Sequence, residues 1–245
     1  MGKVSGPSSR RALLGLATAC FLPSLCRASE LRRLEPPSDD EGSDPALRDL
    51  IQRMVEFVES RDHRRLRSLM SPDFRVEFDS GKGPQSFLRR WQPTHPDSAL
   101  WQILQRALAL RGTFYSKSLY SVPYVYTQFP MDLDPLTWVV ATGADVPLWS
   151  QPSPQGERLA TLDFAIAPLV DPLRPPVLLP KGGYLEVKHP DLGNCFVSSD
   201  AVYSPAGHRL FFEKRRGAWH WISFAAATLA EPPELRSTIV SGKRR

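Results

Sequence analysis

The sequence predicts a mixed α+β fold, with an N-terminal helical segment carrying one strand, a small all-β barrel, and a C-terminal β-hairpin that packs back on the helices. Three observations predict it. Apolar residues recur at helical spacing after residue 44, and short strand-like runs follow one another after residue 135. Near the C-terminus, two aromatic-rich runs flank a turn that ends in Gly217.

These patterns divide the 245 residues into six segments. They are a signal peptide (1–28), a disordered tether (29–43), a helical α+β region (44–134), the barrel (135–204), the hairpin (205–230) and a flexible tail (231–245). The tether is assigned because it has few apolar groups and many charged and turn-forming residues. Such a composition cannot offset the entropy lost on ordering.

The first segment has the pattern of an export signal. Lys3, Arg10 and Arg11 precede Ala12–Leu25, which is 14 residues long and almost wholly apolar. A helix of that length rises about 21 Å, less than the roughly 30 Å hydrocarbon core of a bilayer. The pattern therefore favours a signal peptide cleaved near Ala28 over a transmembrane anchor or a buried N-terminal helix. We expect the mature chain, without a transmembrane span, in the periplasm or secreted.

Two details leave the export route open. Ser9 to Leu14 reads Ser-Arg-Arg-Ala-Leu-Leu, which resembles the twin-arginine signal. Gly15 stands where that signal usually has lysine, so the general secretory route remains an alternative. Cys20 leaves a lipoprotein as a third possibility, although Ala17 stands where the lipidation motif has leucine.

Charge argues against nucleic acid as a partner. The whole chain has 31 basic and 26 acidic side chains, a net charge of +5. Four of the basic residues lie before residue 29 and no acidic ones do, so the mature chain carries 27 against 26, a net charge of +1. The basic pI thus reflects the signal rather than a phosphate-binding surface.

The sequence contains no pattern that predicts catalysis, a cofactor or a metal. Cys195 is the only cysteine after residue 28, and it stands beside Phe196 in an alternating strand, as a buried structural thiol would. The five histidines do not fall at metal-ligand spacing, and no nucleophile or phosphate-loop motif is present. We therefore predict a protein that is not an enzyme.

The clearest helix begins after Asp44, which stands as an N-cap before Pro45. Its apolar face comprises Leu47, Leu50, Ile51, Met54, Val55 and Val58. A second short helix bearing Leu66 follows, and then a strand over 73–79 in which apolar and charged residues alternate. Two more helices carry Trp91 and Trp101.

The segment from Trp138 to Tyr203 resembles a bacterial Src-homology-3-type domain. The residues that match its strand and turn positions are Val146, Leu148, Pro152, Ser153, Leu159, Leu162, Tyr184, Val187, Pro190, Asp191, Phe196 and Val197. The resemblance implies a small barrel with an aromatic-lined groove for a ligand. The chain departs from that pattern at Trp149, Leu192 and Cys195, where the family has other residue types.

The two ends of the chain resemble another family. Helices followed by a strand, and a closing strand that begins with glycine and tryptophan, are found in nuclear-transport-factor-2-like folds. In this chain the helices and strand span 46–79 and the closing strand begins at Gly217 and Trp219. The resemblance implies that the hairpin packs against the N-terminal helices, with the barrel inserted between them.

Large aromatic side chains are the candidate ligand-binding residues. The candidate groove consists of Trp149, Tyr184, Tyr203, Trp219 and Trp221, with the last two on one face of their strand. We expect a non-enzymatic periplasmic binding or interaction module that grips a cell-wall peptide, a glycan or a protein segment. Its expected partner is peptidoglycan or an envelope protein. The alternative is a small-ligand or hydrolytic site in a cone-shaped pocket of the helical region, lined by Phe78, Trp91 and Trp101.

Overall fold

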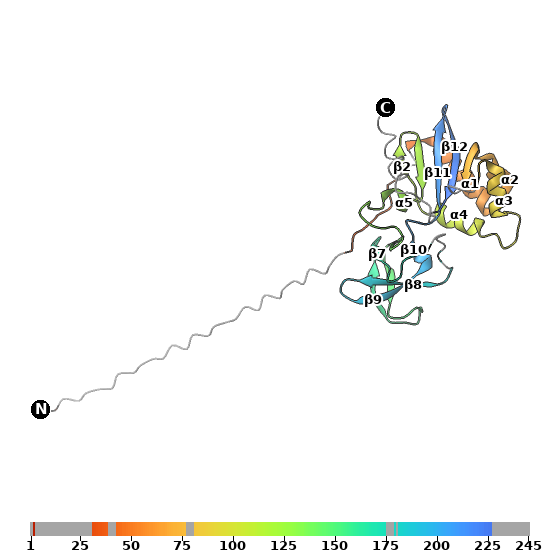
Figure 1. Ribbon diagram of the computed structural model, residues 1–245. Helices are drawn as coiled ribbons and strands as arrows, with labels where there is room; N and C mark the ends of the chain where they lie inside the picture. The colour runs from red at the N-terminus through yellow and green to blue at the C-terminus, as the bar shows by residue number, and fades with distance from the viewer. Residues whose placement is uncertain are drawn as a thin grey trace.

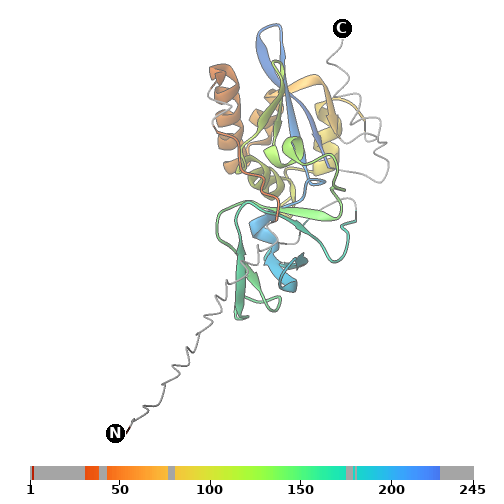
Figure 2. The same cartoon turned by 90° about the vertical axis from the view of Figure 1, so that its left-hand side faces the viewer.

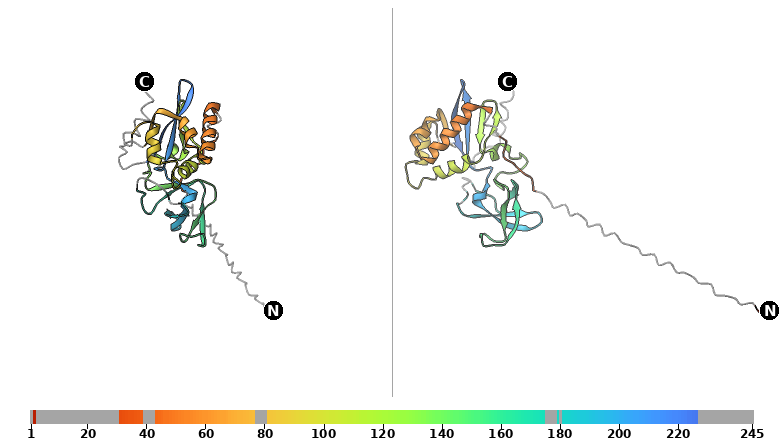
Figure 3. Two further views of the ribbon diagram at one scale, coloured as in Figure 1. Left: turned by 90° about the vertical axis from the view of Figure 1, so that its right-hand side faces the viewer. Right: turned by 180° about the vertical axis from the view of Figure 1, so that it is seen from behind.

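The computed structural model describes residues 2, 31–38, 43–76, 81–174, 179 and 181–226. They form an upper part with the helices and a five-stranded sheet and a lower part with two smaller sheets (Figure 1). The two parts stay separate when the molecule is turned by 90° (Figure 2) and when it is seen from behind (Figure 3). The predicted signal peptide, apart from Gly2, and the predicted tail lie outside the described residues.

The elements alternate between helices and strands in the first half of the chain and are almost all strands in the second. The helices are α1 (Pro45–Glu59), α2 (His63–Ser68), α3 (Pro84–Trp91), α4 (Leu100–Leu108), α5 (Tyr124–Gln128) and the 3-10 turn η2 (Ser199–Ala201). The strands are β1 (Met70–Val76), β2 (Thr113–Ser116), β3 (Leu119–Val122), β4 (Trp138–Ala141), β5 (Val146–Trp149), β6 (Arg158–Leu162), β7 (Ile166–Pro168), β8 (Tyr184–His189), β9 (Gly193–Ser198), β10 (Val202–Tyr203), β11 (Arg209–Arg215) and β12 (Ala218–Ala225).

The predicted C-terminal hairpin is confirmed, and it forms the centre of the main sheet. The strand order is β1-β12-β11-β3-β2, with β1 and β12 parallel and the other pairs antiparallel. Arg216 and Gly217, both at positive φ, make the turn that reverses the chain. The hairpin packs back on the N-terminal region as predicted, since Trp221 N–H donates a 2.9 Å hydrogen bond to Leu69 O.

Helix α1 begins as its sequence pattern predicts. Asp44 is its N-cap and accepts hydrogen bonds from the backbone N–H groups of Ala46 and Leu47. The buried face consists of Leu47, Leu50, Ile51, Met54 and Val58. These side chains join the main hydrophobic core, which the helices share with the inner face of the five-stranded sheet.

The predicted barrel over 135–204 is wrong, although the predicted α+β class holds. Strands β10-β4-β7 form one sheet and β6-β5-β9-β8 form another, and the isolated bridge Leu169–Val187 joins them without closing a barrel. Strand β4 is buried on both faces: Val140 belongs to the main core, whereas Val139 lies in a second core between the small sheets. Regular strand spacing predicts strands but does not fix which of them pair.

Residues 31–38 lie within the predicted tether and pack against the fold. Leu34 N–H donates to Phe164 O at 2.7 Å, and Ile166 N–H donates to Arg32 O at the same distance. The Tyr124 hydroxyl donates to Leu34 O at 3.1 Å. The segment therefore joins the lower sheets to the helical part. In the part of the chain that the structure describes, no helix is long and apolar enough to cross a membrane.

Candidate functional site

The five aromatic residues predicted to line one groove lie in different environments. Trp221, Trp219 and Tyr203 are buried, with exposed fractions of 0%, 6% and 7%. Trp149 and Tyr184 are half-buried on the four-stranded sheet. Trp219 and Trp221 do share one face of β12, but that face is covered by the helices. The five side chains therefore do not form one groove.

Trp149 and Tyr184 instead share the outward face of the four-stranded sheet with a residue that the sequence analysis passed over. Trp149 pairs directly with Phe196 across β5 and β9, and Tyr184 is diagonal to Phe196 on β8. All three are half-buried, while their neighbours Leu148, Val187 and Val197 point into the second core. The Asn194 amide donates to Glu186 Oε1 at 3.0 Å on the same face.

The thiol and the histidines do not form a reactive site. Cys195 is fully buried, as predicted, and burial raises the pKa of its thiol. Its nearest polar partner is Gly193 O, 3.7 Å from Sγ. No cluster of three or more histidine, cysteine or acidic side chains that could hold a metal exists among the described residues.

Aromatic side chains fill the space where the cone-shaped pocket was expected. Phe74, Phe87, Trp221 and Phe224 are completely buried and contact one another, with ring centroids 4.8 to 6.0 Å apart. Trp101 is 2% exposed, and its indole N–H donates to Pro93 O. Phe78 lies outside the described residues.

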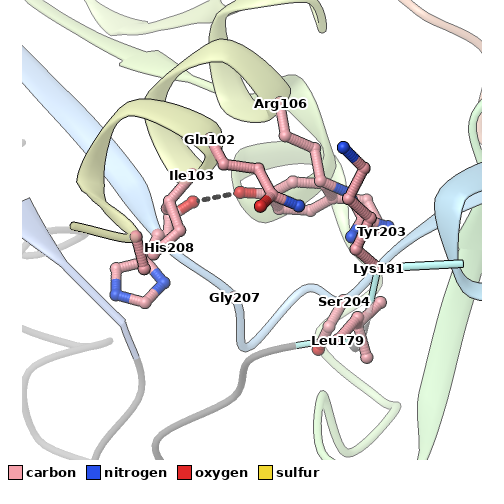
Figure 4. Close-up of a pocket in the computed structure, with 10 residues that line it drawn as sticks. Gln102, Ile103, Arg106, Leu179, Lys181, Tyr203, Ser204, Gly207 and His208 are labelled. Atoms are coloured by element: carbon pink, nitrogen blue, oxygen red, sulfur yellow. Dashed lines mark hydrogen bonds between the residues drawn. The ribbon is translucent and has the colours of Figure 1, made fainter. Parts of the chain in front are cut away.

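A pocket of about 200 Å³ lies between the two parts of the molecule, beside α4 (Figure 4). Its walls come from α4, from the segment before β8, and from the turn between β10 and β11. The lining residues are Ala99, Gln102, Ile103, Arg106, Leu179, Lys181, Tyr203, Ser204, Gly207 and His208. We call this cavity the α4 pocket.

A tight turn shapes one wall of the α4 pocket. The Tyr203 hydroxyl donates to His208 O at 2.5 Å, and Gly207 N–H donates to Ser204 O at 2.8 Å (Figure 4). A Cβ atom on Gly207 would lie 2.9 Å from Ser204 O and 3.2 Å from the Tyr203 ring, so the turn requires glycine here. The wall is therefore held rigid before any ligand arrives.

Arg106 crosses from α4 to the other side of the α4 pocket. Its Nη2 donates to Ser199 O and, at 2.6 Å, to Val202 O, and its guanidinium lies 6.0 Å from the centre of the Tyr203 ring. Burial lowers the pKa of Arg106, while Tyr203 and Asp200 raise it. Because arginine titrates so far above neutral pH, the side chain keeps its positive charge.

His208 forms the other end of the α4 pocket and is neutral at physiological pH. The side chain is 4% exposed, with its ring 5.2 Å from that of Trp91 and 5.1 Å from that of Phe224. Burial, with a smaller contribution from Arg209 and Arg90, lowers the pKa of the imidazole to about 4. The cationic character of the pocket therefore comes from Arg106 and Lys181 rather than from this histidine.

His208 should make the fold sensitive to mild acid. The imidazole of His208 becomes protonated near pH 6.5 in the unfolded chain and only near pH 4 in the folded chain. The stability that neutral His208 contributes is therefore complete above pH 6.5 and is lost as the pH falls towards 4. We expect a loss of about 3 kcal/mol across that window. Urea unfolding at stepped pH measures it, and His208→Phe should flatten the slope. An unchanged slope in the variant would contradict this account.

The residues of the α4 pocket carry no sequence signal that predicts a site. Arg106 is one of several basic residues on exposed or half-exposed helix positions, and Lys181 follows a proline-rich stretch. The walls are about a hundred residues apart and meet only because β10 returns beside β4. Of the predicted groove residues, only Tyr203 belongs to this pocket, and it does so from a buried position.

Comparisons with known proteins found similar solved structures but no matching family. No protein family and no curated protein matches the sequence. An NTF-2-like protein of unknown function from Shewanella oneidensis is 10% identical, covering 74% of this chain and 95% of its own, with a TM-score of 0.28. An NTF2-like protein with a cystatin-like fold from Novosphingobium aromaticivorans is 12% identical, covering 78% and 85%, with a TM-score of 0.26. A putative aromatic ring hydroxylase from Novosphingobium aromaticivorans is 9% identical, covering 80% and 92%, with a TM-score of 0.26.

The resemblance to Src-homology-3-type domains is therefore corrected. Residues 138–203 form two sheets rather than one closed barrel. The residues that suggested the barrel do lie in strands and turns, but these strands form an open four-stranded sheet. A likeness at this level of similarity assigns no activity to this chain.

Proposed function

We propose that this chain is a non-enzymatic binding module that holds a small molecule in the α4 pocket. The observation that carries the proposal is the construction of the cavity. Three segments distant in sequence converge on about 200 Å³ of space. That volume exceeds the roughly 150 Å³ of an engineered cavity that binds benzene, and it is smaller than the pockets that take drug-sized ligands. A ligand of about one ring with a polar substituent fits this space.

The chemistry of the walls supports binding rather than catalysis. Among the residues that the structure describes, no carboxylate lines the α4 pocket, and the Tyr203 hydroxyl is already committed to His208 O. Burial raises the pKa of the Tyr203 phenol, so it stays protonated at neutral pH. The hydroxyl of Ser204 accepts a hydrogen bond from Ala206 N–H and has no base beside it in the pocket wall. These groups can orient a ligand but do not form an acid–base pair.

The proposal places this module outside the cytoplasm. It rests on the export pattern of residues 1–28, which lie outside the described part of the chain apart from Gly2. Fractionation of cells that make the full-length protein tests the location, since a cytoplasmic, uncleaved chain would contradict it.

A tryptophan at the mouth of the α4 pocket should abolish ligand binding. Gln102 and Gln105 are both exposed on α4, but only Gln102 lines the cavity. Gln102→Trp should block the pocket, whereas Gln105→Trp adds the same side chain beside it. A thermal-shift screen with carboxylates, amides, amines and alcohols of about ten heavy atoms measures binding. Hits shared by the wild type and Gln105→Trp should be lost in Gln102→Trp.

Two results would contradict the pocket proposal. One is a screen without any hit, and the other is a set of hits that Gln102→Trp leaves unchanged. Melting temperatures of the two variants without ligand provide the control for folding. Because both substitutions are at exposed helix positions, we expect both melting temperatures within a few degrees of the wild type.

A second candidate function rests on the outward aromatic row of Trp149, Phe196 and Tyr184. Three half-exposed rings on one sheet face can stack on the apolar faces of sugars, with Glu186 and Asn194 beside them for hydroxyl groups. The occupant that fits an exported protein is peptidoglycan. Co-sedimentation with insoluble peptidoglycan should be lost in Trp149→Ala and kept in Gln102→Trp. Equal sedimentation of both variants would remove this candidate.

A further inference from the structure

We infer that the α4 pocket selects a small organic carboxylate with an apolar body, and that Arg106 is the residue that recognises the carboxylate. This inference rests on the proposed function, because it names the ligand class of the same cavity. Its support is the charge, the hydrogen-bonding state and the apolar surface of the pocket walls.

Arg106 is held in place by hydrogen bonds from one of its nitrogens, and its other N–H groups can donate to a ligand. Nη2 is anchored by the carbonyl groups of Ser199 and Val202, and the Tyr203 ring lies under the guanidinium. Nε and Nη1 donate to no described residue. Nε and Nη1 point in different directions from the anchored Nη2, and each can donate a single charge-assisted hydrogen bond to a carboxylate oxygen. Little side-chain entropy is then lost when the ligand binds.

The positive charge at the α4 pocket is not compensated by its walls. Lys181 is exposed, lines the cavity and forms no ion pair with any described residue. Among the described residues, the carboxylate that raises the pKa of Arg106 is that of Asp200, which lies outside the lining and accepts from Gly182 N–H at 2.9 Å. Arg90 and Arg209 add further positive potential around His208. A cavity with this field favours an anion over a neutral or cationic ligand.

The other walls of the α4 pocket determine the chemical character of the part of the ligand that is not charged. Ile103 and Leu179 present aliphatic surface, and the Tyr203 ring adds an aromatic face. An inorganic anion alone would leave these surfaces in contact with water, whereas an apolar body would cover them. A ring of six carbons with one carboxylate satisfies the apolar walls and Arg106 together within about 200 Å³.

Benzoate and benzamide are matched probes of this inference, because they share size and shape and differ in charge. Calorimetric or NMR titration of the full mature chain should show benzoate binding about tenfold or more tightly than benzamide. Raising NaCl from 50 mM to 500 mM should weaken benzoate binding and leave benzamide binding unchanged, since salt screens only the charged ligand.

Two variants assign the selectivity to residues. Arg106→Gln should bring benzoate binding down to the level of benzamide. Because Arg106 also holds two backbone carbonyls, Lys181→Gln is the second variant. Lys181 makes no described structural contact, so its loss should leave the fold intact and weaken benzoate binding by a few-fold.

The results distinguish failure of the carboxylate inference from failure of the proposed ligand-binding function. Equal binding of benzoate and benzamide, or benzoate binding that both variants leave unchanged, overturns the carboxylate inference. If Gln102→Trp still abolishes binding of neutral fragments in that case, the α4 pocket remains a ligand site. Phosphate that competes for Arg106 as strongly as benzoate does would also overturn the organic carboxylate as the ligand class. If no fragment responds to Gln102→Trp, the proposed function fails and this inference fails with it.

Discussion

Replacing Trp221 with alanine should destabilise the protein by about 4 kcal/mol, enough to unfold a large fraction of a marginally stable domain. The indole is completely buried, and its ring lies 4.8 Å from Phe74 and 5.3 Å from Phe87, edge to face. Its N–H donates to Ser223 O at 2.9 Å. The strand that carries it joins the hairpin to β1, so the cavity would open where β12 pairs with the N-terminal region.

Two further substitutions make this prediction specific to the core. Trp221→Phe keeps an aromatic ring among Phe74, Phe87 and Phe224, and it should cost less than half of the alanine substitution. Trp149→Ala removes the same side chain from a half-exposed sheet position and should cost about 1 kcal/mol. Urea unfolding of the three variants gives the comparison. Similar losses for Trp149→Ala and Trp221→Ala would show that Trp221 does not anchor the core.

The contrast between Trp149 and Trp221 shows what the two-residue alternation of side chains along a strand can and cannot predict. It places Trp219 and Trp221 on one face, and the structure agrees. Whether that face meets solvent or core depends on α1 and α3, which lie more than a hundred residues earlier in the chain. Aromatic side chains suit both a ligand surface and a core, so the residue types do not decide between them.

Elements defined by nearby residues are predictable from the sequence, whereas pairings over long distances are not. Asp44 and the apolar stripe behind it define α1, and Gly217 defines the hairpin turn, because their partners lie within a few positions. The pairing of β10 with β4 joins residues about sixty positions apart, and it both prevents a closed barrel and creates one wall of the α4 pocket. For that reason Arg106 and Lys181 could not be recognised as neighbours beforehand.

Replacing Asp44 should also destabilise the protein strongly, because its carboxylate both caps helix α1 and accepts hydrogen bonds from the C-terminal hairpin. Oδ1 accepts from the backbone N–H groups that begin α1, and Oδ2 accepts from Lys214 Nζ at 2.7 Å and from the Trp219 indole at 3.0 Å. Asp44→Ala leaves helix donors uncapped and the indole N–H of a 6% exposed tryptophan without an acceptor. We expect a loss of about 3 kcal/mol in unfolding free energy, combining the cap with the unsatisfied buried donor.

The contribution of the cap can be separated from that of the tertiary bonds with Asp44→Asn, which keeps one oxygen for the cap and places an amide NH2 donor where Oδ2 accepts from Lys214 and Trp219. This variant should lose about 2 kcal/mol, less than Asp44→Ala, because the helix stays capped. Asp62→Ala is the matched control. Asp62 caps α2 in the same way, but among the described residues it has no partner outside its own helix, so its loss should be smaller than that of Asp44→Ala. If the two alanine variants lost equal stability, the bonds to Lys214 and Trp219 would contribute nothing.

The unfolding free energy measured between pH 4 and pH 2 tests the contribution of the Asp44 carboxylate independently. The hydrogen bond from Lys214, followed by that from Trp219, lowers the pKa of Asp44 from 3.8 to about 2. A carboxylate with a lowered pKa stabilises the fold fully above pH 4, and that stability is lost as pH falls towards 2. Asp44→Asn should therefore flatten the curve between pH 4 and 2, below the window in which His208 acts. Asp73, whose pKa is also lowered to about 2 by Arg215, and Asp62, whose pKa is lowered by its backbone hydrogen bond from Arg65, contribute to the slope that remains, and Asp73→Asn in the Asp44→Asn background should reduce it further.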